Sequence, residues 1–193
     1  MTLLMPQADL IVWDGASLVY APGTPALAFP AGIMASLTRT ESRVVGISDT
    51  TWTERSGNVA KRVDQLLGIV GGTKTLFDCA GTKNINSGQT AAQIIAEAET
   101  YWDARRAAGF DFIISTTVPD SVGFDAGEDT KRADLNAAII ASASLDAVVD
   151  LTGIAALNDA SNTTYFHDGT HFTATGAALV VAPGLAAYQG LVP

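Results

Sequence analysis

The chain has 193 residues, 48% of them hydrophobic, which is enough for the core of one domain, and we expect a single domain over residues 1–193. Acidic residues outnumber basic ones by 20 to 11, giving a formal net charge of −9. Because nucleic acids and anionic membranes attract clustered Lys and Arg, this balance argues against both as main partners. It favours a small neutral molecule or an uncharged polymer as the ligand.

Short apolar runs alternate with helical patterns along the whole chain. Runs rich in Val, Ile, Leu and Phe predict strands at 9–13, 43–48, 75–80, 111–119 and 147–151. Apolar residues at helical spacing predict helices at 26–37, 58–69, 89–108, 130–142 and 173–189. Because no tight hairpin signals join the strands, we expect an α/β fold: a parallel sheet covered by helices on both faces, in three layers.

One candidate site residue follows the first predicted strand. Ser17 comes after a glycine turn, at the carboxyl end of that strand, where open α/β sheets place their ligands. The single cysteine, Cys79, lies in an apolar run, which indicates a buried and inert thiol. One cysteine and two histidines without paired spacing do not form a zinc site, so we expect neither a metal nor a cofactor.

Both histidines lie in one stretch near the C-terminus, at positions 167 and 171. Asp168 precedes His171 by three residues, close enough for its carboxylate to bond one ring nitrogen and leave the other facing outward. An imidazole oriented in this way can activate a serine hydroxyl. On this stretch alone, Asp168 is equally suited to cap the helix that begins near Phe172, with His171 at the surface. We expect His167 to lie at the rim of the site or on the surface.

The ends and apolar stretches of the chain bear on localisation. Residues 1–9 have neither the basic region nor the apolar run of a signal peptide, and no stretch reaches the roughly 18 apolar residues of a membrane span. We therefore expect synthesis in the cytoplasm and no membrane partner. Assembly into a virion or secreted particle stays open.

Three segments together resemble the motif blocks of the SGNH, or GDSL-type, serine hydrolases. Gly15-Ala16-Ser17-Leu18 resembles the Gly-Asp-Ser-Leu block, with alanine in place of aspartate, and Asp168-Gly169-Thr170-His171 resembles the Asp-x-x-His block. Gly81-Thr82-Lys83-Asn84 resembles the Gly-x-Asn-Asp block. The resemblance implies a flavodoxin-like, five-stranded parallel sheet between helices, and ester hydrolysis through an acyl-enzyme. It makes Ser17 the nucleophile, His171 the base and then the acid, and Asp168 the orienting carboxylate.

The resemblance also implies donors for the oxyanion, and here the sequence departs from the family. The second block is short of its glycine, so the backbone N–H of Asp49 is expected to join that of Ser17. In the third block, strict alignment puts Lys83 where the family has asparagine, and a shift of one residue brings in Asn84. We favour Asn84, because a neutral amide reproduces the family's chemistry; Lys83 is an electrostatic or substrate-binding candidate.

Residues 85–92 and 104–110 are similar to SGNH domains of bacteriophage tail and cell-surface polysaccharide-processing proteins. This likeness implies removal of O-acetyl groups from a glycan, with Tyr20, Trp52 and Tyr165 as sugar-stacking aromatics. These side chains are equally suited to packing inside the protein. An alternative function is a carbohydrate-binding or structural module of a phage-like particle that keeps the fold without turnover.

Overall fold

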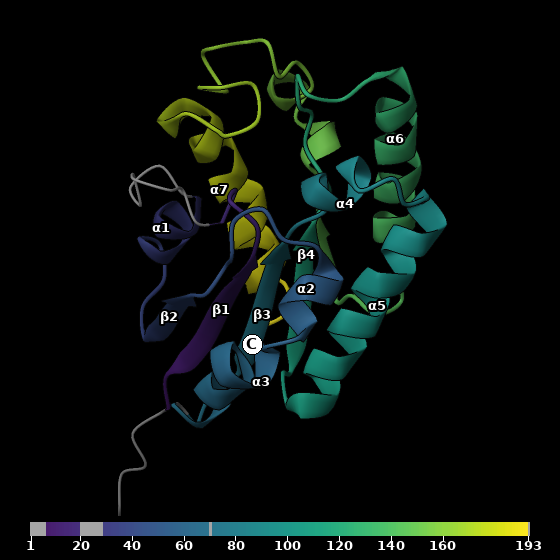
Figure 1. Cartoon of the computed structure of the whole chain (residues 1–193). Helices are drawn as coiled ribbons and strands as arrows, with labels where there is room; N and C mark the ends of the chain where they lie inside the picture. The colour runs from purple at the N-terminus through teal and green to yellow at the C-terminus, as the bar shows by residue number, and fades with distance from the viewer. Residues whose placement is uncertain (1–6, 20–28, 70, 193) are drawn as a thin grey trace, which may run out of the picture.

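The chain folds around one five-stranded sheet. The structure, a computed structural model, describes residues 7–19, 29–69 and 71–192. All strand pairs are parallel, in the order β2-β1-β3-β4-β5 (Figure 1). The strands are β1 Asp9–Gly15, β2 Thr40–Val44, β3 Lys74–Cys79, β4 Phe112–Thr116 and β5 Ala147–Val149. The predicted α/β class with a five-stranded parallel sheet is confirmed.

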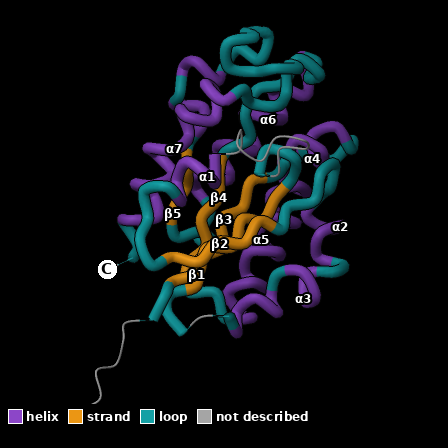
Figure 2. Tube along the Cα trace, turned by 90° about the vertical axis from the view of Figure 1, so that its left-hand side faces the viewer, coloured by secondary structure: helices purple, strands orange, loops and turns teal. Residues whose placement is uncertain are grey.

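Helices cover both faces of the sheet, as predicted. Figure 2 shows α1 and α7 on one face and α2, α3 and α5 on the other, where α6 also packs. The helices are α1 Phe29–Met34, α2 Trp52–Ser56, α3 Val59–Arg62, α4 Thr82–Asn86, α5 Ala91–Ala108, α6 Ala126–Ala141 and α7 Ala174–Gln189, with 3-10 turns η2 Asp64–Gly68, η3 Leu151–Gly153 and η4 Ala155–Leu157. None of the helices in the described ranges has both the length and the hydropathy needed to cross a bilayer.

Strand β1 shows how the sequence divides the core into two layers. Leu10 and Val12 are buried among α2, α3, α5 and α6, whereas Ile11 and Trp13 are buried among α1 and α7. Successive side chains of a strand point to opposite faces, so a central strand covered on both faces is apolar at consecutive positions, here over residues 10–13. This is why a continuous apolar run located β1 correctly in the sequence.

Edge strand β2 differs from its prediction. It was expected at 43–48 but spans Thr40–Val44, pairing Thr40 with Asp9 and Val44 with Trp13. An edge strand is covered less than a central one, and its half-exposed polar residues left no apolar run to detect. Beyond β2, the amide N–H of Ile47 still donates to the Gly15 carbonyl at 2.9 Å, so this segment follows β1 toward the site.

Several helix boundaries also differ. The helix expected at 58–69 is divided into α3 and η2, and the one expected at 26–37 is α1, with 26–28 outside the described residues. Helix α6 starts at Ala126, earlier than expected, because Asp125 and Glu128 form a capping box. Helices α2 and α4 were not predicted.

The fold brings distant segments to one end of the sheet. All five strands run in the same direction, so the segments that follow them meet at the carboxyl edge, where α4 lies at the top of the sheet in Figure 1. The chain between β5 and α7 reaches this same end. A site at this edge can therefore combine residues from several parts of the sequence.

Candidate active site

Three side chains from two distant segments form a continuous chain of contacts. His171 Nε2 lies 2.7 Å from Ser17 Oγ, and His171 Nδ1 lies 2.7 Å from Asp168 Oδ2. An ionised carboxylate can only accept hydrogen bonds, so the ring proton lies on Nδ1. Nε2 therefore has a free lone pair that can accept the proton of the serine hydroxyl. The structure thus brings together the three residues that the sequence predicted as nucleophile, base and orienting carboxylate.

The end of β1 determines where Ser17 lies. Gly15 has φ +137°, and a Cβ at this position would lie 2.1 Å from the carbonyl oxygen of Cys79 on β3. Only glycine fits such a close approach. Ala16 N–H then donates to the same Cys79 carbonyl at 2.8 Å, which ties the turn to β3. Ser17 is partly exposed while Ala16 and Leu18 are buried, so the turn presents its hydroxyl to solvent.

The loop that carries the histidine is anchored by two phenylalanines. Phe166 and Phe172 form an antiparallel bridge, their ring centroids lie 5.3 Å apart, and both side chains are buried. Between them, His167 N–H donates to the His171 carbonyl at 2.9 Å. Gly169 makes the tight return with φ +79°. The aromatic anchors therefore fix a short, exposed loop on the hydrophobic core.

Asp168 is held in its charged form. Partial burial alone would raise its pKa, but hydrogen bonds from the backbone N–H and ring of His171 and from the Thr170 N–H lower the pKa to about 2. Those backbone bonds to Oδ1 measure 2.8 and 3.0 Å. The carboxylate is therefore ionised at any pH at which an imidazole acts as a base.

The loop after β4 supports the histidine loop from the side. Ser121 Oγ lies 2.8 Å from Thr170 Oγ1, and Val122 N–H donates to the Gly169 carbonyl at 2.9 Å. These contacts join the carboxyl end of β4 to the segment before α7. They hold Thr170, and with it the neighbouring base, over the edge of the sheet.

Ser17 and His171 open onto a cleft with a volume of about 280 Å³. Its other lining side chains are small or polar. Those that bear on the chemistry are Ser48, Asp49, Thr82, Lys83, Asn86 and Ser121. The cleft suits a small group next to the serine hydroxyl and a polar partner beyond it.

The cleft is lined by Asp49, predicted as a backbone donor to the oxyanion, and by Lys83, the electrostatic or substrate-binding candidate. Asp49 lines it and has a left-handed backbone with φ +56°, a region that few residues other than glycine adopt. Thr50 Oγ1 closes this turn by donating to the Ile47 carbonyl at 2.7 Å. Lys83 also lines the cleft, and its ammonium donates to both carboxylate oxygens of Asp49 at 2.9 Å each.

Asn84 does not reach the cleft, which corrects our preference for it as an oxyanion donor. Its side chain is fully buried and its amide donates to Gln89 Oε1 and Glu97 Oε2, both at 3.1 Å. Neighbouring residues of a helix point about 100° apart. With Lys83 on the cleft side of α4, Asn84 faces α5 instead.

Asn86, which the sequence did not indicate as a site residue, does line the cleft. Asn86 lies three residues after Lys83 and four after Thr82, a spacing that puts all three on one side of a helix. A predicted helix over Thr82–Asn86 would have indicated that Asn86 lies on the same side as Lys83.

Two of the three predicted aromatic residues, Trp52 and Tyr165, are not among the residues that line the cleft. Trp52 is fully buried and donates its indole N–H to Asp78 at 2.7 Å, so it packs inside the protein and cannot stack on a sugar. Tyr165 is partly buried against the core on the α1 and α7 side. Tyr20 lies outside the described residues.

His167 lies beside the triad without joining it. Its ring stacks on that of His171, with centroids 5.6 Å apart and planes within 18°, and its Nδ1 is 3.8 Å from Asp168 Oδ2. The ligand atoms of these three residues lie within 4.8 Å of one another. A metal ion needs lone pairs that converge on one point, and nearly parallel rings do not supply them.

Cys79 lies beneath the site and has no reactive character. Its side chain is 1% exposed, and burial raises the pKa of its thiol to about 12. Thr116 Oγ1 donates to its sulfur at 3.1 Å. A thiol that is buried and protonated at neutral pH is a poor nucleophile.

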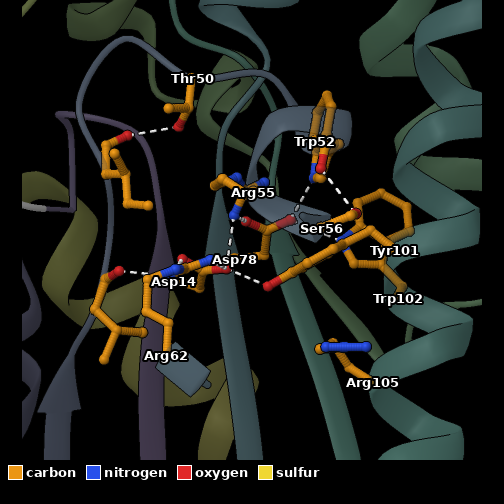
Figure 3. A network of polar contacts seen from close by, with 12 residues as sticks. Asp14, Thr50, Trp52, Arg55, Ser56, Arg62, Asp78, Tyr101, Trp102 and Arg105 are labelled. Carbon is orange, nitrogen blue, oxygen red and sulfur yellow. Dashed lines mark hydrogen bonds and ion pairs between the residues drawn. The ribbon is translucent and has the colours of Figure 1, made fainter. Parts of the chain in front are cut away.

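Near the carboxyl ends of β1 and β3 lies a buried ion cluster, which we define as Asp14, Arg55, Arg62, Asp78 and Tyr101 (Figure 3). Arg55 Nη1 lies 2.9 Å from Asp14 Oδ2 and 2.8 Å from Asp78 Oδ1. All three of these side chains are 0% exposed. The Arg55 pKa is raised because the charges of Asp78 and Asp14 outweigh the cost of burial.

Each carboxylate of this cluster has further donors. Asp78 Oδ2 accepts the indole N–H groups of Trp52 and Trp102, both at 2.7 Å, and Asp14 accepts from Arg62 and from the Tyr101 hydroxyl. Burial alone would raise the Asp14 pKa, but Arg55, Arg62 and the Tyr101 hydroxyl lower it. The cluster joins the ends of β1 and β3 to α2, close to the segments that form the cleft.

The chain is thus a parallel α/β/α sandwich with a Ser-His-Asp arrangement at the carboxyl edge of its sheet. No protein-family model matches the sequence, and neither does any curated protein. Solved structures do match over nearly the full chain.

Three of these structures indicate the range of the match. A lipolytic protein of the G-D-S-L family from Veillonella parvula has a TM-score of 0.76 at 16% identity, over 94% of this chain and 99% of that one. A GDSL-like lipase from Bacteroides thetaiotaomicron has a TM-score of 0.66 at 18% identity, over 94% of this chain and 87% of the lipase. A catalytic mutant of an acetylxylan esterase from Geobacillus stearothermophilus has a TM-score of 0.70 at 13% identity, over 92% of this chain and 93% of the esterase. The chain therefore has the SGNH hydrolase fold.

Proposed function

We propose that this protein is a serine ester hydrolase that acts through an acyl-enzyme on short acyl esters. The observation that carries the proposal is the unbroken contact from Asp168 through His171 to Ser17, with both links at 2.7 Å, at the mouth of a cleft. A serine hydroxyl is a weak nucleophile until a positioned base accepts its proton, and this geometry provides that base.

The reaction has two steps. Ser17 Oγ forms a bond to the ester carbonyl carbon, His171 Nε2 takes the hydroxyl proton, and the carbonyl π electrons move onto the oxygen. When that oxygen re-forms the double bond, the alcohol leaves with the proton from His171, and the acyl group stays on Ser17. Water then repeats the sequence and releases the acid, while Asp168 stabilises the imidazolium in both steps.

The cleft favours a small acyl group and a polar alcohol. The cleft has a volume of about 280 Å³, and its described lining contains no large apolar side chain against which a long acyl chain could pack. We propose the O-acetyl groups of carbohydrates as the substrate class. The structural likeness to an acetylxylan esterase supports this choice.

The test is hydrolysis of p-nitrophenyl acetate, butyrate and octanoate, followed by acetylated xylose. We expect turnover of the acetate, less of the octanoate, and loss of turnover in Ser17→Ala to about 10⁻³ of the wild-type kcat or below. Ser36→Ala is the matched control, since this exposed serine lies between α1 and β2. Acetylation of Ser17, detected by mass spectrometry during turnover, would identify the acyl-enzyme directly.

One result would favour the alternative function. If the wild-type protein hydrolyses none of these esters but retains an acetylated glycan in a binding assay, it is a binding module with the hydrolase fold. Hydrolysis that persists unchanged in Ser17→Ala would contradict both functions of this site.

A further inference from the structure

We infer that Lys83 supplies the positive charge that stabilises the oxyanion, leaving its resting ion pair with Asp49 as the transition state forms. This inference rests on the proposed ester hydrolysis and deepens it. It makes Lys83 a catalytic residue and Asp49 the group that competes for its ammonium.

The fold places Lys83 in the same cleft as the nucleophile. Lys83 lies on α4, which begins three residues after β3 ends at Cys79, and β3 is the direct neighbour of β1, the strand that leads to Ser17. The Lys83 and Ser17 side chains line the same cleft as the His171 ring. A donor for the oxyanion has to reach the reacting carbonyl within the cleft that holds the nucleophile, and Lys83 lines that cleft.

The side-chain amide of Asn84 is not available as a competing donor to the oxyanion. The Asn84 amide donates to Gln89 and Glu97, and the Asn84 side chain is 0% exposed. Turning this amide into the cleft would break two hydrogen bonds and leave the Glu97 carboxylate short of a partner. The Asn86 amide does line the cleft, but it is neutral and offers no full charge.

The positive charge of Lys83 is held by an exposed ion pair with Asp49. The Lys83 ammonium is 2.9 Å from both oxygens of Asp49, and the two side chains are 37% and 77% exposed. Ion pairs in such exposed positions are weak and are exchanged readily for another partner. The resting pair therefore holds the ammonium beside the cleft without locking it there.

Exchange should occur at the transition state rather than on substrate binding. The carbonyl oxygen of a bound ester is neutral and competes poorly with the Asp49 carboxylate for Lys83. The oxygen of the tetrahedral intermediate carries a full negative charge and competes well. An interaction that is stronger in the transition state than in the ground state raises kcat and leaves KM nearly unchanged.

The experiment compares kcat and KM for p-nitrophenyl acetate in three variants, each checked for wild-type circular dichroism and thermal unfolding. Lys83→Met keeps most of the chain length and removes the charge, and we expect kcat to fall about 10²- to 10³-fold with little change in KM. Lys83→Arg keeps the charge and should retain more activity than Lys83→Met. Asp49→Asn removes the competitor and keeps the backbone N–H, so kcat should rise.

The outcomes separate the possible errors. If the pair only props the cleft open, Asp49→Asn and Lys83→Met will both lower kcat, which overturns the inference. If Lys83 binds a charged part of the substrate, Lys83→Met will raise KM for the anionic p-nitrophenyl succinate monoester and leave kcat on the acetate intact, which also overturns it. If hydrolysis does not depend on Ser17, the proposed function fails first, and the role of Lys83 fails with it.

Discussion

At the scale of single residues, Asp168 determines what His171 can do. Its pKa of about 2 keeps the carboxylate charged, and a charged carboxylate holds the ring proton on Nδ1. The result is a free Nε2 lone pair 2.7 Å from the Ser17 hydroxyl. The chemistry of the site therefore depends on a tautomer as well as on a distance.

Asp168→Asn should reduce kcat about 10⁴-fold, the scale of loss seen when a serine triad is held in the wrong tautomer. An asparagine amide can donate to Nδ1, which places the proton on Nε2, facing Ser17. The measurement is kcat for p-nitrophenyl acetate from pH 5 to 9, with circular dichroism to confirm folding. Because the wrong tautomer is present when the ring is neutral, the loss should persist at alkaline pH. Recovery of the wild-type rate there would contradict this role.

The sequence located some site residues better than others, for a physical reason. Ser17 and the pair Asp168 and His171 come directly after a strong strand and directly before a strong helix, so their places follow from long, periodic elements. The choice between Lys83 and Asn84 depends on which way each side chain points from α4, a helix of 5 residues. Its direction is set by contacts with α5, which a single sequence does not display.

At the scale of elements, the buried ion cluster joins α2 to the sheet. Arg55 contributes the charge that Asp14 and Asp78 share, and it lies on a helix of 5 residues that is too short to be stable by itself. The sequence did not predict α2 because its stability comes from burial of Trp52 and Arg55, although the Thr51 and Glu54 capping box was a local signal.

Arg55→Met should lower the free energy of unfolding by about 3 to 5 kcal/mol, because the buried Asp78 carboxylate loses its ion pair and Asp14 keeps only the one with Arg62. Arg43→Met is the control: Arg43 pairs with Glu41 in an exposed bridge, and its removal should cost about 1 kcal/mol or less. Urea unfolding at pH 7 measures both. Equal, small losses in the two variants would show that the cluster does not support the fold.

At the scale of the whole molecule, the sequence predicted the layers and the direction of the strands, but not all of their boundaries. The central strands β1, β3 and β4 are buried on both faces and carry consecutive apolar residues, so these apolar runs are diagnostic. The edge strand β2 is constrained by pairing with β1 alone, and polar residues satisfy that pairing equally well. The buried ion cluster was not predicted, because its members come from β1, β3, α2, α3 and α5 and meet only once the sheet is assembled.

The same cluster should make stability depend on pH at both extremes. The folded pKa of Asp14 is below its ordinary value of 3.8, so its contribution to stability is present above that value and is lost as pH falls below it. Tyr101 has the opposite sign. Burial and the neighbouring Asp14 charge raise its pKa above the ordinary 10.0, so its contribution is present below pH 10 and is lost as pH rises above it.

Tyr101→Phe isolates the alkaline part of this dependence. The variant should be less stable than the wild type at pH 7, because Asp14 loses a hydrogen bond. Above pH 10, the unfolded wild-type chain gains stability by ionising this tyrosine, whereas the unfolded variant cannot. The difference in free energy of unfolding between the two proteins should therefore shrink steadily from pH 9 to pH 11 in urea titrations. Both proteins carry the same remaining charges, so their general loss of stability at high pH cancels in this difference. If the difference does not change with pH, the Tyr101 hydroxyl ionises as readily in the folded protein as in the unfolded chain, which contradicts the prediction.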